Sequence, residues 1–155
     1  MKTKKFMMVA FTMLCAMTAT TLFSSCGDDK DDTPQYVMYD VSDYKKDVKI
    51  SGQTIESLLV DYMIEELAGK KEHVPAVNIA YMIDYNINSV ISQINKTGGI
   101  PVNVSDRDRQ VIEWYDTVLT PFIGGSYKGV IDGQIKIYHS VNGNSKETIK
   151  VYSFE

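Results

Sequence analysis

The feature that most restricts how this chain can fold is a charge-free stretch near its N-terminus, Phe6–Phe23. Lysines at positions 2, 4 and 5 precede it, and the small residues Ser24 and Ser25 follow it. A basic start, an apolar middle and small residues before a cut site are typical of a secretory signal segment. A transmembrane helix is the alternative, but four threonines interrupt the stretch, which is also short for a bilayer span. We therefore expect this segment to be a secretory signal that is removed from the mature chain.

The end of this segment, Phe23-Ser24-Ser25-Cys26, resembles the lipobox of bacterial lipoproteins, although leucine is usual at the position of Phe23. The resemblance implies that Cys26 becomes the first mature residue and carries lipid, which attaches the chain to a membrane. Cys15 lies within the removed segment, so the mature chain would then have no free thiol. A plain secretory signal, with Cys26 as a free thiol, is the alternative.

An acidic segment, residues 26–34, follows the lipobox and contains Asp28, Asp29, Asp31 and Asp32. Its composition is typical of a solvated tether. It also resembles the export signal of Bacteroides-group lipoproteins, in which acidic residues directly follow the lipidated cysteine. That resemblance implies display on the outer membrane at the cell surface, and attachment facing the periplasm is the alternative.

Length and charge bound what remains. Removing residues 1–25 leaves 130 residues, enough for one domain, which we place at residues 35–155. The chain has 16 basic and 20 acidic residues, and three lysines leave with the signal segment, so the mature net charge is −7. This acidity argues against nucleic acid as a partner. Two cysteines are too few for a disulfide scaffold or a four-cysteine zinc site.

Three helices are predicted in the first part of the domain. Residues 54–68 have apolar side chains at helical spacing, with Thr54 as N-cap and Gly69 at the end. Residues 76–96 are ambiguous, because 77–88 alternates as a strand would, whereas an apolar arc at about 100° per residue continues to Ile94. We predict a helix there. A third helix is predicted from the N-cap Ser105 to about residue 120, with Trp114 in the core.

A change to strand-like sequence follows. Residues 127–131, 135–141 and 148–154 are rich in Ile, Val and Tyr, with turn signals at Asp132-Gly133 and Asn142-Gly143-Asn144. This predicts a three-stranded meander that places Ile137 opposite Ile149 and Ile135 opposite Val151. Near the start of the domain, residues 36–41 suggest a short strand, and residues 43–49 a loop. The predicted fold class is α+β, with three helices followed by a C-terminal three-stranded antiparallel meander.

The side chains with catalytic chemistry are few. His73 is predicted to be exposed in a loop, and His139 to be a half-buried residue of a strand. No zinc-binding spacing is present in the sequence, and we expect no metal or other cofactor. Paired carboxylates could serve a small hydrolase, which is the alternative to a binding protein. The candidates all lie on the third predicted helix: Asp106, Asp108, Glu113 and Asp116.

Aromatic residues favour a binding role. Tyr127, Tyr138 and Tyr152 are predicted on three neighbouring strands, where amphipathic rings would suit a protein or a glycan surface. The alternative is that they fill a half-buried sheet. Asp116-Thr117-Val118 is similar to the O-glycosylation site of Bacteroides envelope proteins, which implies a modification of Thr117. The sequence thus predicts a lipid-anchored envelope protein, not an enzyme, that binds a protein partner first and a glycan second.

Overall fold

The computed structural model describes residues 34–70 and 74–155, which form one compact unit of helices and an antiparallel sheet. The predicted α+β class is therefore confirmed. The signal segment, Cys26, the four tether aspartates and His73 lie outside the described residues. The helices and strands are β1 (Val37–Val41), α2 (Tyr44–Asp47), β2 (Lys49–Ile50), β3 (Gln53–Thr54), α3 (Ile55–Leu67), α4 (Pro75–Lys96), α5 (Val104–Leu119), β4 (Ile131–Val141) and β5 (Glu147–Phe154).

The sheet has five antiparallel strands, curled into a half-barrel around the long central strand β4. Strand β5 pairs along one edge of β4, while β1 and β2 pair one after the other along its opposite edge. Strand β3 extends the sheet from β2. The prediction of a meander of three C-terminal strands is therefore wrong, because two of the three partners of β4 come from the N-terminal part of the domain.

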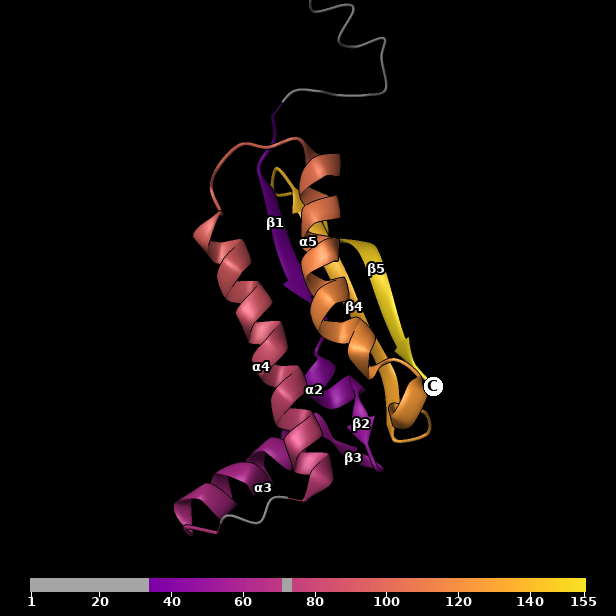
Figure 1. Ribbon diagram of the computed structural model, residues 1–155. Coiled ribbons are helices and arrows are strands. Elements are labelled where there is room, and N and C mark those ends of the chain that lie inside the picture. The colour runs from indigo at the N-terminus through magenta and orange to yellow at the C-terminus, as the bar shows by residue number, and fades with distance from the viewer. Residues whose placement is uncertain (1–33, 71–73) are drawn as a thin grey trace, which may run out of the picture. The chain divides into compact units, whose positions relative to one another are not determined.

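Between β1 and β2 the chain leaves the edge of β4 for one helical turn, α2, where the sequence suggested a loop (Figure 1). Gly133 lies in β4 opposite this turn, with φ at +108°. A Cβ at this position would lie 2.2 Å from the carbonyl oxygen of Asp47, so only glycine allows α2 to approach. The predicted turn at Asp132-Gly133 is therefore wrong, since the glycine serves a close backbone approach inside a strand.

The pairing of β4 with β5 differs from the prediction by one residue. Ile135 lies opposite Tyr152, and Ile137 opposite Lys150, with a bulge at the next step. Such a shift exchanges the two faces of a strand. Consequently Tyr152 is buried, and Val151, predicted on the apolar face, is 43% exposed. The predicted strand 127–131 is also wrong, because a 3₁₀ helix, Gly125–Tyr127, and a turn precede β4.

The three long helices follow the sequence prediction closely. The Thr54 Oγ1 atom accepts a hydrogen bond from the Ser57 backbone N–H at 3.2 Å, as expected of an N-cap. Residues 77–88 are helical throughout, within α4. The N-cap of α5 lies two residues earlier than predicted, because the Asn103 side chain, and not Ser105, accepts from the Asp106 N–H at 3.1 Å.

Helices α4 and α5 lie side by side across one face of the sheet, and α3 crosses α4 near its N-terminal end (Figure 1). The core lies between this helical layer and the sheet. Trp114 is only half-buried, so its predicted place in the core is confirmed in part. The largest fully buried side chains are Tyr115, Phe154, Ile50, Ile55, Leu58, Ile83, Ile87, Leu119, Ile131, Ile135, Ile137 and Val48.

Candidate functional site

The three tyrosines predicted to form a ligand surface do not share one. Tyr152 is 3% exposed and fills the core. Tyr138 is three residues along β4 from Ile135, the partner of Tyr152, and so faces the opposite side of the sheet. Tyr127 lies in a 3₁₀ helix and packs against Phe122, with ring centroids 5.3 Å apart. The surface as predicted required three neighbouring strands that the fold does not contain.

Buried and half-buried tyrosines instead donate hydrogen bonds to aspartates of the helical layer. The hydroxyl of Tyr152 donates to Asp116 at 2.6 Å, and that of Tyr39 donates to Asp108 at 2.6 Å. Both bonds join the sheet to α5. Burial raises the pKa of both tyrosines well above the ordinary value, and the hydrogen bond to a carboxylate raises the pKa further.

Tyr44 of α2 makes the third such pair. Its hydroxyl donates to Asp84 of α4 at 2.5 Å, and the Lys45 ammonium lies 3.5 Å from the same carboxylate. Burial, followed by the hydrogen bond to Asp84, raises the pKa of Tyr44 in the same way. We call these three contacts (Tyr39–Asp108, Tyr44–Asp84, Tyr152–Asp116) the tyrosine–aspartate pairs. Their shared arrangement indicates a structural role for these tyrosines.

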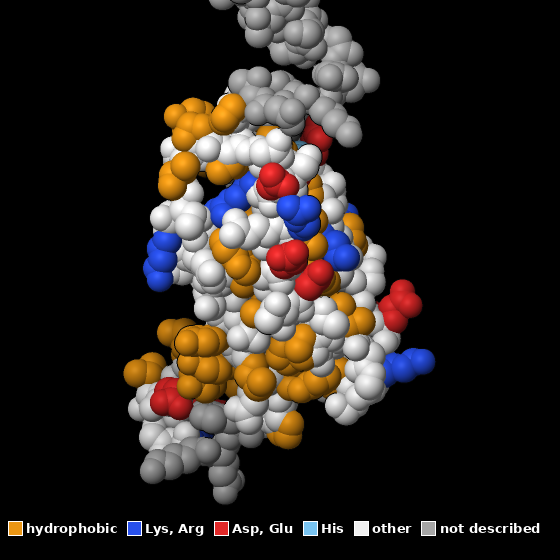
Figure 2. Space-filling view, turned by 45° about the horizontal axis from the view of Figure 1, so that its top comes forward, with side chains coloured by type: hydrophobic (Ala, Val, Ile, Leu, Met, Phe, Trp, Pro, Cys, Tyr) orange, Lys and Arg blue, Asp and Glu red, His pale blue; other side chains and the backbone are white. Residues whose placement is uncertain are grey.

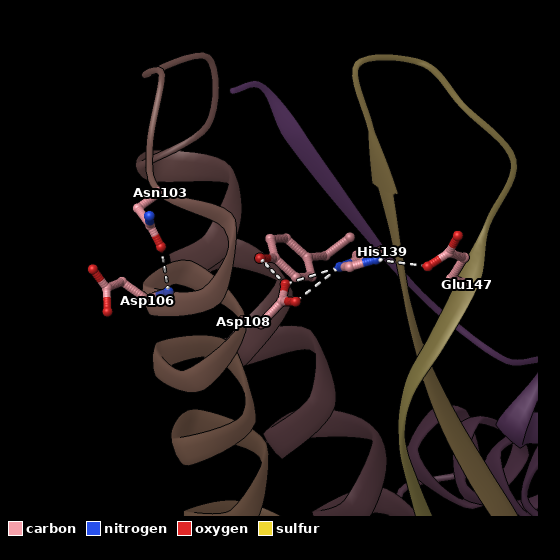
Figure 3. A network of polar contacts seen from close by, with 6 residues as sticks. Asn103, Asp106, Asp108, His139 and Glu147 are labelled. Carbon is pink, nitrogen blue, oxygen red and sulfur yellow. Dashed lines mark hydrogen bonds and ion pairs between the residues drawn. The ribbon is translucent and has the colours of Figure 1, made fainter. Parts of the chain in front are cut away.

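A polar network extends from Asp108 across three strands (Figure 3). Tyr39, His139 and Glu147 are paired neighbours on β1, β4 and β5. The Nδ1 atom of His139 lies 2.9 Å from an Asp108 oxygen, and Nε2 lies 3.5 Å from Glu147. The His139 side chain is 12% exposed, which confirms its prediction as a half-buried strand residue.

The chemistry open to this network is limited by its geometry. Asp108 and Glu147 contact opposite nitrogens of the His139 ring, so the three groups do not converge on a point where one metal ion could bind. In the part of the chain that the structure describes, no cluster of three or more metal-binding side chains exists. The nearby hydroxyl of Ser140 donates to the carbonyl oxygen of Asn144. The network therefore joins α5 to the sheet and shows no nucleophile paired with the imidazole.

The four carboxylates proposed for a hydrolase are divided between two sides of α5. Asp106 and Glu113 line a cavity of about 480 Å³ at the start of the helix, and Asp106 binds Arg109 at 2.7 Å. Asp108 and Asp116 instead face the sheet, where they accept from tyrosines. Because α5 turns by about 100° per residue, the first two acids and the last two lie on different sides of the helix. The four acids therefore do not form one cleft.

Arg107, in the same helix, is a buried cation that the sequence reasoning did not single out. It is 8% exposed, and its guanidinium group donates to Gln110 at 2.6 Å and to Thr97. The guanidinium carbon lies 5.2 Å from the Trp114 ring centroid. The sequence did contain a signal for this burial. Arg107 lies four residues before Val111 and therefore on the same side of α5 as the buried stripe.

Thr117, the predicted glycosylation site, is exposed in the last turn of α5. Its hydroxyl donates to the Glu113 carbonyl oxygen at 2.8 Å, a contact within the helix. The side chain therefore points away from the core.

Apolar side chains gather on the outside of α3. Val60, Met63, Ile64 and Leu67, which we call the outer stripe, are between 52% and 86% exposed. In the space-filling view, one group of hydrophobic side chains lies in the lower part of the molecule and another near its top (Figure 2). Isolated exposed apolar residues are ordinary, but a group of them on one helix face indicates a contact surface.

The neighbouring part of α4 adds exposed aromatic rings. Tyr81 stacks on Tyr62 of α3, with ring centroids 4.8 Å apart, and on Tyr85 at 6.2 Å. Tyr81 and Tyr85 are 42% and 62% exposed, and Met82 between them is 47% exposed. We call Tyr62, Tyr81 and Tyr85 the tyrosine row. Sequence reasoning missed this surface because it used the spacing of these residues only to predict helices, and did not ask which of their faces stay exposed.

Comparison with protein-family models, curated proteins and solved structures gives no match to this chain. Within residues 34–70 and 74–155, no helix combines the length and apolar character needed to span a membrane. The fold and the exposed surfaces thus define the protein as an α+β domain with a curled antiparallel sheet and an apolar helix at one end.

Proposed function

We propose that this chain is a lipid-anchored protein of the bacterial cell envelope whose domain binds another protein through α3 and the N-terminal half of α4. Two observations support the binding role: the exposed outer stripe of α3, and the exposed rings of Tyr81 and Tyr85 on the neighbouring part of α4. Large exposed apolar side chains cost solubility unless a partner covers them, and aromatic and Met side chains are enriched in protein interfaces.

A protein partner fits this surface better than a glycan does. The outer stripe consists of aliphatic and Met side chains, which offer no hydrogen bonds to the hydroxyl groups of a sugar. The glycan hypothesis depended on Tyr138 and Tyr152 acting together, and these two side chains face opposite sides of the sheet. Catalysis is not part of the proposal, since Asp108, Asp116 and His139 join α5 to the sheet.

The anchoring part of the proposal rests on the lipobox-like sequence at Cys26 and on the acidic tether. Mass spectrometry of the mature chain should find acyl groups on Cys26, and Cys26→Ser should lack them. A wild-type chain without acyl groups would contradict the anchor. Digestion of intact cells with an added protease should remove the domain if the tether directs surface display, whereas a protected domain would indicate attachment facing the periplasm.

Site-specific photo-crosslinking in intact cells tests the binding role. A photoreactive residue should replace Met63 in one variant, Tyr85 in a second and Val151, an exposed residue of β5, in a control. We expect protein adducts at positions 63 and 85 and none above background at 151. Equal yields at all three positions would refute the proposed surface. So would the absence of adducts at both position 63 and position 85.

A further inference from the structure

We infer that α3 acts as a recognition helix, whose outer stripe lies in an apolar groove of a partner protein lined along its edges by lysine and arginine. This inference rests on the proposed function and adds how the partner is bound. Its basis is that α3 has two apolar stripes, of which the domain uses only one.

The inner stripe attaches α3 to the domain. Ile55 and Leu58 are at most 1% exposed, and Leu59 and Tyr62 pack partly buried against the same core. At about 100° per residue these four side chains occupy one side of the helix. The inner stripe therefore accounts for most of the docking of α3 on the domain.

The outer stripe points to the opposite side. Val60, Met63, Ile64 and Leu67 follow the spacing i, i+3, i+4 and i+7, which brings four side chains onto one face over two turns. Helices that bind in the apolar groove of another protein present their anchor residues at this spacing. Leu67, at the C-terminal end of the stripe, is 86% exposed, so the whole length of the stripe is accessible in the described structure.

The charge of α3 selects the chemistry of the partner. The helix contains four acidic residues and no basic residue, and Asp61 and Glu66 fall on opposite flanks of the outer stripe. A groove with basic edges complements this arrangement. An anionic membrane surface would be repelled by it, as would the α3 helix of a second copy placed face to face.

The experiment uses the full chain in intact cells, with a photoreactive residue at position 64 as the probe. Truncating two anchors, Met63→Ser with Leu67→Ser, should lower the yield of the protein adduct at least about tenfold. Reversing an exposed charge on one flank of the stripe, Asp61→Lys, should lower it about threefold. The matched control Met38→Ser, at an exposed site of β1, should leave the yield unchanged. Circular dichroism should show that each variant keeps the wild-type unfolding midpoint.

Mass spectrometry of the adduct decides between occupants. We expect the crosslinked peptide to come from a different protein and to contain apolar residues flanked by Lys or Arg. A peptide from this chain itself, or a lipid adduct, would overturn the inference. Adducts at position 85 without any at position 64 would refute the recognition helix while leaving the proposed function intact, and adducts at neither position would refute both.

Discussion

Tyrosines behave differently in two regions of this domain. Between the sheet and α5, Tyr39 and Tyr152 are buried or half-buried, and each donates a hydrogen bond to an aspartate of the helix. On α4, Tyr81 and Tyr85 stack along the helix and stay 42% and 62% exposed. In the first region the hydroxyl group has a buried partner and the ring is part of the core. In the second region the rings form surface.

The difference indicates how the domain separates stability from binding. The tyrosine–aspartate pairs and the His139 network fix the helical layer on the sheet, where a lost contact leaves a polar group without a partner. The outer stripe of α3 and the exposed rings of α4 make few contacts within the described domain. Substitutions should therefore affect stability in the first region and partner binding in the second.

The largest effect on stability is expected at the contact between α2 and β4. Gly133→Ala would place a Cβ 2.2 Å from the Asp47 carbonyl oxygen at a φ of +108°, and we expect a loss of about 4 kcal/mol from overpacking and backbone strain. Gly143→Ala is the control, because its φ is +77° and nothing lies within 4 Å of the added Cβ. It should cost about 1 kcal/mol. Urea unfolding measures both, and equal losses would contradict the close approach of α2.

A second comparison sets the two stripes of α3 against each other. Leu58→Ala removes a side chain that is 1% exposed and should cost about 3 kcal/mol, the usual loss for a buried leucine. Leu67→Ala removes one that is 86% exposed and should change the unfolding free energy by less than about 0.5 kcal/mol. A large loss for Leu67→Ala would show that the domain itself uses the outer stripe.

A third comparison concerns the tyrosine hydroxyls. Tyr152→Phe leaves the ring in the core but removes the hydrogen bond to Asp116, and should cost about 1.5 kcal/mol. Tyr85→Phe, at an exposed site, should be neutral within about 0.5 kcal/mol. Chemical denaturation of the two variants under the same conditions gives both values. Similar values for the two would contradict the division between the regions.

The smallest effect is a pH dependence. Because Tyr39, Tyr44 and Tyr152 have folded-state pKa values raised above their unfolded value near 10, their stabilisation is complete below pH 10 and is lost as the pH rises above it. Each should contribute a loss of about 1 kcal/mol between pH 10 and 11. Unfolding at both pH values should show a smaller loss for Tyr39→Phe than for wild type. An identical loss would contradict the raised pKa.

The helices were predictable because their signals are local. Thr54 caps α3 through the contact expected from its position, and the apolar arc of residues 76–96 extended too far for a strand. The sheet was not predictable in the same way. Its pairing joins β1 and β2 to β4, across about 90 residues of sequence, and no local pattern specifies a partner so distant.

The candidate site shows the same limit. The sequence identified His139 as a half-buried strand residue, but the alignment of Tyr39, His139 and Glu147 depends on strand pairing. The one-residue shift between β4 and β5 moved Tyr152 from the predicted surface into the core. The outer stripe could have been found from the sequence. The segment that forms α3 has apolar residues at helical spacing on two faces, and only one face can pack against the domain.

By itself, the sequence determined the α+β class and the three long helices, because each depends on composition or on periodicity within a short segment. The envelope address stays a prediction from the sequence. The tertiary structure decided which strands pair, why Gly133 lies inside a strand, and which tyrosines are buried. It also decided that α3 buries its inner stripe and leaves its outer stripe more than half exposed. The physical reason is that burial is a property of the assembled domain, so identical residue types become core or surface according to their distant neighbours.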